Sequence, residues 1–241
     1  MRLNCALVSS FLFIFVLAGD QQPPSLDRTE KSIITAELPI TNWAGAVRLA
    51  RLQGETISYA AGTFTVPSAR GATSSSFNIL VGISGYPPCV QFVLNVVITV
   101  TVNGNGVSYQ AWGQGYNGNV MVAPDWFLVS TGQEIRAIVR ALTLTSGLFI
   151  LINLNTGRVW AEYVSGGIMF CHQDAAWIIT TPQSQVTTLP NFHTVTFTAI
   201  LTKISGTRRV PDNLDTVNIR NQGRVMTDTQ VNAPFVIIRY L

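Results

Sequence analysis

The sequence is poor in charged residues, and its few cations are dispersed. Charged residues make up 11% of the 241 positions and hydrophobic residues 47%, with a formal net charge of +3 at pH 7. Arg208 and Arg209 form the only adjacent basic pair, so the basic patch of a nucleic-acid-binding protein is not expected. The apolar fraction instead predicts a folded domain with a sizeable core.

The sequence also lacks the motifs of several enzyme classes. Its two histidines, His172 and His193, lie in no Cys/His cluster with zinc-ligand spacing, and Gly-x-Ser-x-Gly and phosphate-loop motifs are absent. We therefore expect neither a metal nor another cofactor, and nothing suggests a Ser-His-Asp site. Asn-x-Ser/Thr is absent as well, so N-glycosylation is not expected.

The amino-terminal residues have the features of a secretory signal. Arg2 supplies the positive end, residues 6–18 are nearly all apolar, and Val16 and Ala18 suit a small-residue cleavage site. The apolar run is shorter than the roughly 20 residues of a membrane-spanning helix, which favours a signal peptide over residues 1–18. We expect a secreted, extracellular protein that has no membrane association after signal removal.

Cysteine is scarce, and its distribution agrees with that route. Cys5 would leave with the signal, so the mature chain would keep only Cys89 and Cys171. An even pair in an oxidising compartment predicts one disulfide, with two buried thiols as the alternative. The bridge would close a loop of about 80 residues and stabilise the fold by roughly 4 kcal/mol.

The remaining chain divides into a leader and one β-domain. Residues 19–40 are polar, contain prolines and show no periodic pattern, so they are either a propeptide or a flexible tail. Residues 41–241 alternate β-branched and aromatic residues between turn residues, and no window has a helical period. We expect this part to form an all-β domain of two packed antiparallel sheets and to be monomeric.

Two hairpins are the clearest local predictions. Residues 96–102 and 107–112 flank the turn sequence Asn103-Gly104-Asn105-Gly106, and residues 148–154 and 158–163 flank Asn155-Thr156-Gly157. Further strands are predicted at 63–67, 132–145, 175–180, 194–201, 216–219 and 235–240.

A series of short motifs lies along the β-domain. The motifs, in order, are Asn42-Trp43-Ala44-Gly45-Ala46-Val47, Phe64-Thr65-Val66-Pro67-Ser68, Val81-Gly82-Ile83-Ser84-Gly85, Tyr109-Gln110-Ala111-Trp112, Thr131-Gly132-Gln133-Glu134-Ile135, Asn153-Leu154-Asn155-Thr156-Gly157 and Val195-Thr196-Phe197-Thr198. Taken together they resemble the secreted fungal glutamic peptidases (eqolisins, family G1, formerly A4). The resemblance covers about residues 40–241 and implies a concanavalin A-like β-sandwich of two curved antiparallel sheets, the eqolisin type.

The resemblance also implies a site and a disulfide. In the family, a Gln and a Glu in a cleft on a concave sheet face activate one water for acid proteolysis. The Glu acts as general base and then acid, and the Gln helps to stabilise the oxyanion. Cys89 and Cys171 match a family disulfide.

Both catalytic positions are substituted in this sequence. Counted from Cys89, the Gln position falls on Asn95, or on Leu94 if the Tyr86-Pro87-Pro88 loop has no gap; strand parity favours Asn95. Counted from Cys171, the Glu position falls on Thr180. An Asn amide still donates and accepts hydrogen bonds, but a Thr hydroxyl does not titrate near working pH and cannot act as the base.

Other cleft positions have become neutral as well. Ser84, Gln110 and Gln114 stand where the family has acidic residues, and Leu80 stands where it has a Trp. No Asp or Glu occurs between Glu55 and Asp125. The residues predicted to line a retained peptide- or glycan-binding groove are Ser84, Gln110, Trp112, Gln114 and Tyr116.

Three hypotheses follow. The first is a secreted, catalytically impaired family member (a pseudopeptidase) with a retained binding groove. The second is an active acid endopeptidase that uses another carboxylate; Glu162 is the candidate, because Asp174 lies six residues, or roughly 20 Å, from Thr180 along the same strand. The third is a structural or lectin-like secreted module.

Overall fold

The computed structural model describes residues 41–71, 74–84, 93–104, 106–115, 119–166, 170–182, 186 and 188–241. The predicted signal peptide and leader lie outside these ranges, as do Cys89 and Tyr116, so the bridge between Cys89 and Cys171 stays a prediction. None of the described residues forms a helix that is long and apolar enough to cross a membrane.

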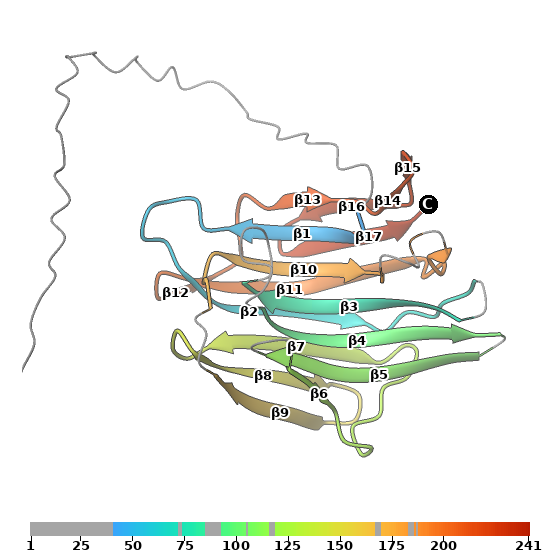
Figure 1. Cartoon of the computed structure of the whole chain (residues 1–241), viewed down its shortest axis with the longest axis horizontal. Helices are drawn as coiled ribbons and strands as arrows, with labels where there is room; N and C mark the ends of the chain where they lie inside the picture. Colours follow the sequence, from blue (N-terminus) through green and yellow to red (C-terminus); the bar gives the residue numbers. More distant parts are fainter. Residues whose placement is uncertain are drawn as a thin grey trace, which may run out of the picture. The chain divides into compact units, whose positions relative to one another are not determined.

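Two antiparallel sheets form the domain and confirm the predicted all-β sandwich (Figure 1). The first sheet has the order β13 (Asp215–Val217), β1 (Trp43–Leu49), β10 (Asp174–Thr180), β3 (Ser75–Ile83), β4 (Leu94–Asn103), β5 (Gly106–Gly115), β6 (Asn119–Val122). The second has the order β16 (Thr227–Asn232), β17 (Phe235–Tyr240), β11 (Thr194–Ile204), β2 (Ile57–Thr65), β7 (Glu134–Ala141), β8 (Ser146–Asn153), β9 (Arg158–Ser165), and β12 (Thr207–Arg209) pairs with β11. A small ribbon joins β14 (Arg220–Asn221) and β15 (Arg224–Val225).

The two predicted hairpins are present as β4–β5 and β8–β9. The strand predicted to run to Thr145 ends at Ala141, because a tight turn follows in which the Thr143 and Ser146 hydroxyls lie 2.7 Å apart in a hydrogen bond. Residues of β1 and β3 were missed by the sequence analysis, since their apolar runs are short or interrupted by glycine and serine.

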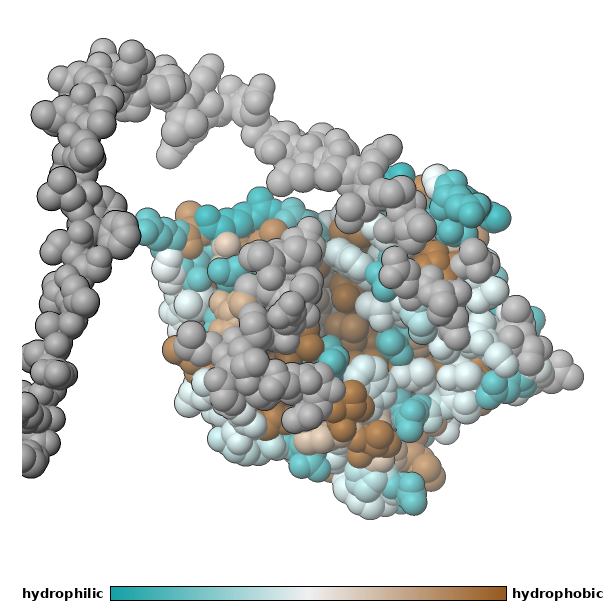
Figure 2. Space-filling model, in the orientation of Figure 1, coloured by the Kyte–Doolittle hydropathy of each residue, from teal (hydrophilic) through white to brown (hydrophobic). Residues whose placement is uncertain are grey.

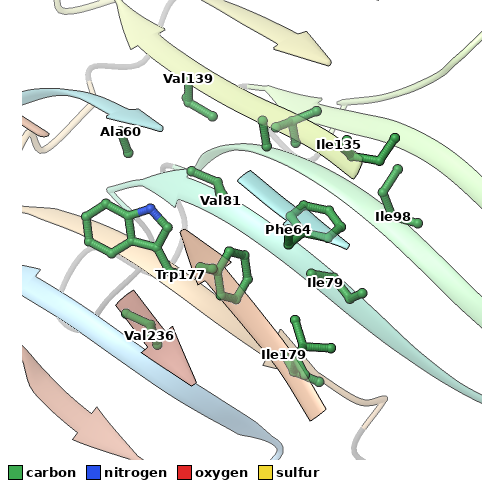
Figure 3. Close-up of a cluster of buried hydrophobic side chains, with 14 of the residues drawn as sticks. Ala60, Phe64, Ile79, Val81, Ile98, Ile135, Val139, Trp177, Ile179 and Val236 are labelled. Atoms are coloured by element: carbon green, nitrogen blue, oxygen red, sulfur yellow. The ribbon is translucent and has the colours of Figure 1, made fainter. Parts of the chain in front are cut away.

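The core lies between the sheets and is filled by alternate residues of each strand (Figure 3). Trp177 of β10 is fully buried at its centre, and its indole N–H donates to the Ala61 carbonyl of β2 at 2.8 Å. This hydrogen bond joins the two sheets. It also satisfies the only polar atom of the Trp177 side chain.

A second close contact fixes the spacing of the sheets near β5. The Phe149 ring of β8 packs directly against Gly113, where an added Cβ would lie 2.3 Å from the ring. Gly115 is approached in the same way by Val164 of β9. Glycine is required at Gly113, because no side chain fits under the Phe149 ring, whereas an added Cβ at Gly115 would lie 3.0 Å from Val164.

A buried ion-pair cluster closes the end of the sandwich beside the β1–β2 turn. The Arg48 guanidinium donates to Glu55 at 2.8 Å and to Asp212 at 3.2 Å, and only 5% of the Arg48 side chain and 6% of the Glu55 side chain are exposed. Burial raises the pKa of Glu55, but the backbone N–H groups of Arg51 and Leu52 together with Arg48 outweigh it and hold the pKa below its ordinary value.

Gly113→Ala tests the close packing of the sheets. We expect the free energy of unfolding to fall by about 1–3 kcal/mol, because the added methyl group overlaps the Phe149 ring. Gly106→Ala in the same strand is the matched control, since its Cβ would meet only the Asn103 carbonyl oxygen at 3.6 Å. Urea unfolding followed by fluorescence measures both. Equal stability of the two variants would contradict the packing argument.

Glu55→Gln tests the buried ion pair through its pH dependence. Because the pKa of Glu55 is lower in the folded protein, the carboxylate contributes stability that is fully present above its unfolded value of 4.5 and is lost as pH falls through the folded value. The variant should be less stable than wild type at pH 7, and this difference should shrink towards pH 3. Urea midpoints measured from pH 7 to pH 3 check it, and a constant difference across that range would refute it.

Candidate functional site

The outer face of the first sheet carries Asn95, Thr180 and several other residues that the sequence analysis singled out. The register of four strands, β10, β3, β4 and β5, arranges them in three rows. The threonine row consists of Thr180, Asn78, Thr99 and Gln110. The apolar row consists of Ile178, Leu80, Val97 and Trp112. The amide row consists of Ala176, Gly82, Asn95 and Gln114.

The threonine row is joined by side-chain hydrogen bonds that cross four strands. The Trp112 indole N–H reaches over from the neighbouring row and donates to the Thr99 hydroxyl oxygen at 2.7 Å. The Thr99 hydroxyl donates to Asn78 Oδ1 at 2.7 Å, and Asn78 Nδ2 donates to the Thr180 hydroxyl oxygen at 3.3 Å. Thr180 therefore ends a neutral hydrogen-bonded ladder at the position where the resemblance places a catalytic carboxylate.

The apolar row gives the middle of the face its character. Leu80, Ile178 and Trp112 are half-buried, whereas Val97 is almost completely covered by its neighbours. Figure 2 shows apolar surface gathered in the middle of this face, with more polar atoms beside it. The side chains of the threonine row and of the amide row, on either side of the apolar row, project from the same face of the sheet, because they share strand parity.

The amide row contains Asn95 and Gln114, which are directly opposite each other on β4 and β5. Asn95 Nδ2 donates to Gln114 Oε1 at 3.4 Å. Asn95 Oδ1 is buried and accepts no hydrogen bond from any residue that the structure describes. Leu94 has the opposite parity, is fully buried and contacts the backbone at Gly147 of β8, so the residue of this pair on the outer face is Asn95.

Asn95 and Thr180 share a face but are not brought together. Thr180 pairs with Asn78 and Asn95 pairs with Gly82, so their rows are four residues apart along the strands. At about 3.3 Å per residue and about 4.8 Å per strand, their Cα atoms are roughly 16 Å apart across the sheet. One water molecule cannot contact both side chains at this separation.

Carboxylates are rare on this face. Within the described residues, β1, β3, β4 and β5 contribute none, β10 contributes Asp174 and the edge strand β13 contributes Asp215, which pairs with Arg51. Asp174 is buried, six residues from Thr180, and its row lies one step beyond the amide row. Its Cα is about 12 Å from that of Asn95 by the same strand spacings.

Glu162, the other carboxylate considered, lies on the second sheet. It is part of the edge strand β9, where its carboxylate accepts a hydrogen bond from the Trp160 indole at 3.2 Å. Its strand neighbours of the same parity, Trp160 and Val164, are buried against the inner side of the sandwich, and Val164 contacts Gly115. Glu162 therefore points away from the outer face that bears Asn95 and Thr180.

The remaining predicted groove residues have different placements. Gln110 is exposed at the end of the threonine row, and Gln114 is half-buried in the amide row. Ser84 is fully buried, with φ of 62°, and its hydroxyl oxygen accepts a hydrogen bond from the His172 backbone N–H at 2.9 Å. Ser84 thus holds the β3 end against the segment before β10 rather than standing on the surface.

His172 and His193 each interact with residues near them in the fold. Desolvation lowers the pKa of His172, and a hydrogen bond with the Thr143 backbone partly offsets this. His193 is exposed, and its backbone N–H donates to Asn191 Oδ1 at 2.8 Å. The described parts of the chain contain no group of three or more His, Cys, Asp or Glu side chains that could hold a metal ion.

Sequence reasoning missed Asn78, Thr99 and Ile178. Asn78 carried a signal, because a polar amide at an alternate position of an otherwise apolar strand faces outward or needs a partner. Its partner was not visible, since the pairing of β3 with both β10 and β4 is a long-range feature.

Comparison with known proteins agrees with the fold and the motifs. Aspergillopepsin-2 of Aspergillus niger is 27% identical over 248 residues, which cover 91% of this chain and 86% of the relative. The crystal structure of scytalidoglutamic peptidase superposes with a TM-score of 0.72 at 25% identity, covering 83% of this chain and 98% of that one. Aspergilloglutamic peptidase of Aspergillus niger has a TM-score of 0.63 at 27% identity, covering 69% and 99%.

The family model described as the peptidase A4 family matches residues 41–240, which is almost all of the β-domain. The resemblance inferred from the short motifs is thereby confirmed. The chain belongs to the peptidase A4 family, the family of the glutamic peptidases.

Proposed function

We propose that this chain is a secreted, catalytically impaired member of the peptidase A4 family whose outer face binds extended polypeptide. The observation that carries the proposal is the neutral ladder that ends at Thr180. A side chain that accepts a hydrogen bond from an amide and has no titratable group cannot take a proton from water as a carboxylate does. General acid/base assistance contributes about 10² to 10⁴ to such reactions, so its loss removes most of the rate.

The neutral character extends beyond Thr180. The three rows contain amides, hydroxyls and aliphatic side chains, and the nearest carboxylates on the face are Asp174 and Asp215 at its margins. Asp174 is buried and its Cα lies about 12 Å from that of Asn95 by the strand spacings, which counts against its sharing a water molecule with Asn95. Glu162 lies on β9 of the second sheet and not on the outer face of the first, which counts against the second enzyme hypothesis.

The ligands of related proteins favour a polypeptide over a glycan as the ligand of this chain. Scytalidoglutamic peptidase is known with a peptide-based transition-state analogue, and the eqolisin SCP-B with the tripeptide Ala-Ile-His. The apolar row of this chain offers aliphatic contacts and one half-buried aromatic side chain, Trp112, which suit apolar peptide side chains. We expect Trp112 to be a principal contact. Tyr116, the other retained aromatic residue, lies outside the described residues.

Secretion is part of the same proposal. It rests on the signal-like residues 1–18 and on the pair Cys89 and Cys171, which suits an oxidising compartment. We propose that the leader 19–40 is either removed or left as a tail and that the mature protein is a monomer.

An acid proteolysis assay tests the loss of activity. We expect the purified mature chain to release at least about 100-fold fewer peptides from acid-denatured casein at pH 2–7 than aspergillopepsin-2 does, because it lacks a general base. Robust cleavage that is abolished by Thr180→Ala, Asp174→Asn or Glu162→Gln would overturn the proposal and identify the working residue.

The double substitution Asn95→Gln with Thr180→Glu is the companion variant in that assay. It returns both family residue types, yet we expect no gain of proteolysis, since the two positions are roughly 16 Å apart. A gain of acid proteolysis would show instead that the two positions converge on one water when the original residues are present.

Secretion from a fungal host tests the processing. We expect the secreted product to begin after residue 18, or after about residue 40 if the leader is a propeptide, and a non-reducing peptide map to contain Cys89 linked to Cys171. Retention inside the cell with Met1 intact, or two free thiols in the mature chain, would contradict this part of the proposal.

A further inference from the structure

We propose that the ladder makes the Thr180 hydroxyl a hydrogen-bond donor to a backbone carbonyl oxygen of the bound peptide. The position of the family's catalytic Glu would then recognise a hydrogen-bond acceptor of the ligand. The inference rests on the proposed peptide-binding function and specifies how that face recognises its ligand. It assigns Thr180 to ligand contact, and it assigns Thr99 and Asn78 to positioning.

The direction of the ladder follows from its first member. An indole N–H can only donate, so the Thr99 oxygen accepts from Trp112. The contact from Thr99 to Asn78 is 2.7 Å, the usual length of an O–H···O bond, whereas the contact from Asn78 to Thr180 is 3.3 Å, which suits a longer N–H···O bond. The Asn78 amide therefore accepts from Thr99 and donates to Thr180.

The direction of the ladder determines how the Thr180 hydroxyl can form a further hydrogen bond. A hydroxyl has one hydrogen to donate, and here its oxygen is already occupied as an acceptor. Within the described residues no acceptor receives the Thr180 hydrogen, and Thr180 is half-buried on the outer face, open to solvent. The ladder thus leaves a single oriented donor at its end, directed away from Asn78.

A complementary acceptor lies on the amide row. Asn95 Oδ1 is buried and has no hydrogen-bond donor among the described residues, although its Nδ2 is used by Gln114. A buried acceptor without a hydrogen bond lowers the free energy of unfolding. A ligand N–H can supply that bond if the ligand reaches Asn95 Oδ1.

The spacing of donor and acceptor sets the length of the ligand. Thr180 and Asn95 are roughly 16 Å apart, which equals about five residues of extended peptide at 3.3 Å each. The straight path between them crosses the apolar row, where Leu80 and Val97 lie. A ligand that matches is a neutral, extended segment of about five residues with aliphatic side chains at its centre.

Calorimetric titration with a defined peptide tests the donor role. The probe is the uncharged pentapeptide acetyl-Ser-Val-Ile-Val-Ser-amide, together with analogues in which one backbone amide at a time is replaced by an ester. We expect Thr180→Val to weaken binding of the parent peptide about fivefold, the value of one net hydrogen bond, and Thr180→Ser to stay within about twofold of wild type. One ester analogue should bind more weakly than the parent to wild type but equally to Thr180→Val.

Thr99→Val tests positioning through the ladder. It removes the Thr99 hydroxyl on β4, which donates the hydrogen bond that orients the Asn78 amide on β3. We expect weaker peptide binding, and no additional loss when Thr99→Val is combined with Thr180→Val, since both remove the same donor. Thr101→Val, on the same face of β4 but outside the ladder, is the matched control and should bind as wild type does.

The outcomes separate the two levels of the proposal. If wild type binds neither the pentapeptide nor unfolded casein, the peptide-binding function itself is wrong. If wild type binds but Thr180→Val binds equally well, or Thr180→Ser loses as much affinity as Thr180→Val, then only the donor role is overturned. Thermal unfolding of each variant shows that a loss of affinity does not reflect a loss of fold.

Discussion

The register of β10 against β3 is the constraint on which the rest of this molecule depends. It places Thr180 opposite Asn78 on the outer face and, at the same time, sends Trp177 and Ile179 into the core. Side chains alternate with a period of two, so a slip of one residue would expose Trp177 and bury Thr180. The hydrogen bond from Trp177 to Ala61 then ties this register to the second sheet. The polar ladder is therefore fixed by the same packing that stabilises the core.

The outer face shows how a polar surface can be retained without charge. Amide and hydroxyl groups satisfy one another along the ladder, and each member both accepts and donates except the terminal Trp112 and Thr180. A carboxylate at the Thr180 position would accept from Asn78 as readily as the hydroxyl does, but it would present acceptors to a ligand where the hydroxyl presents a donor. The change of residue thus alters the chemistry of the face without removing its hydrogen-bonded framework.

Stability and recognition are kept in separate parts of the domain. The buried ion pair of Arg48 and Glu55 lies at the end of the sandwich near the β1–β2 turn, where it holds the turn in place. The close contact of Phe149 with Gly113 is on the inner side of β5, whereas Trp112 and Gln114 project from its outer side. Alternation along one strand is enough to serve both purposes.

The sequence by itself determined the class of fold, the family and the neutral character of the site. Alternating β-branched residues and the turn around Asn103 and Gly104 were sufficient to predict the β4–β5 hairpin, because hairpin pairing is local. The motif order and the positions of Asn95 and Thr180 were readable in the same way. What only the tertiary structure decided is which of these residues meet. It separated Asn95 from Thr180, buried Ser84, placed Glu162 on the second sheet and joined Asn78 to Thr99 and Thr180. These contacts link residues up to 102 positions apart, and they depend on strand register across the sheet, which no local pattern of residues specifies.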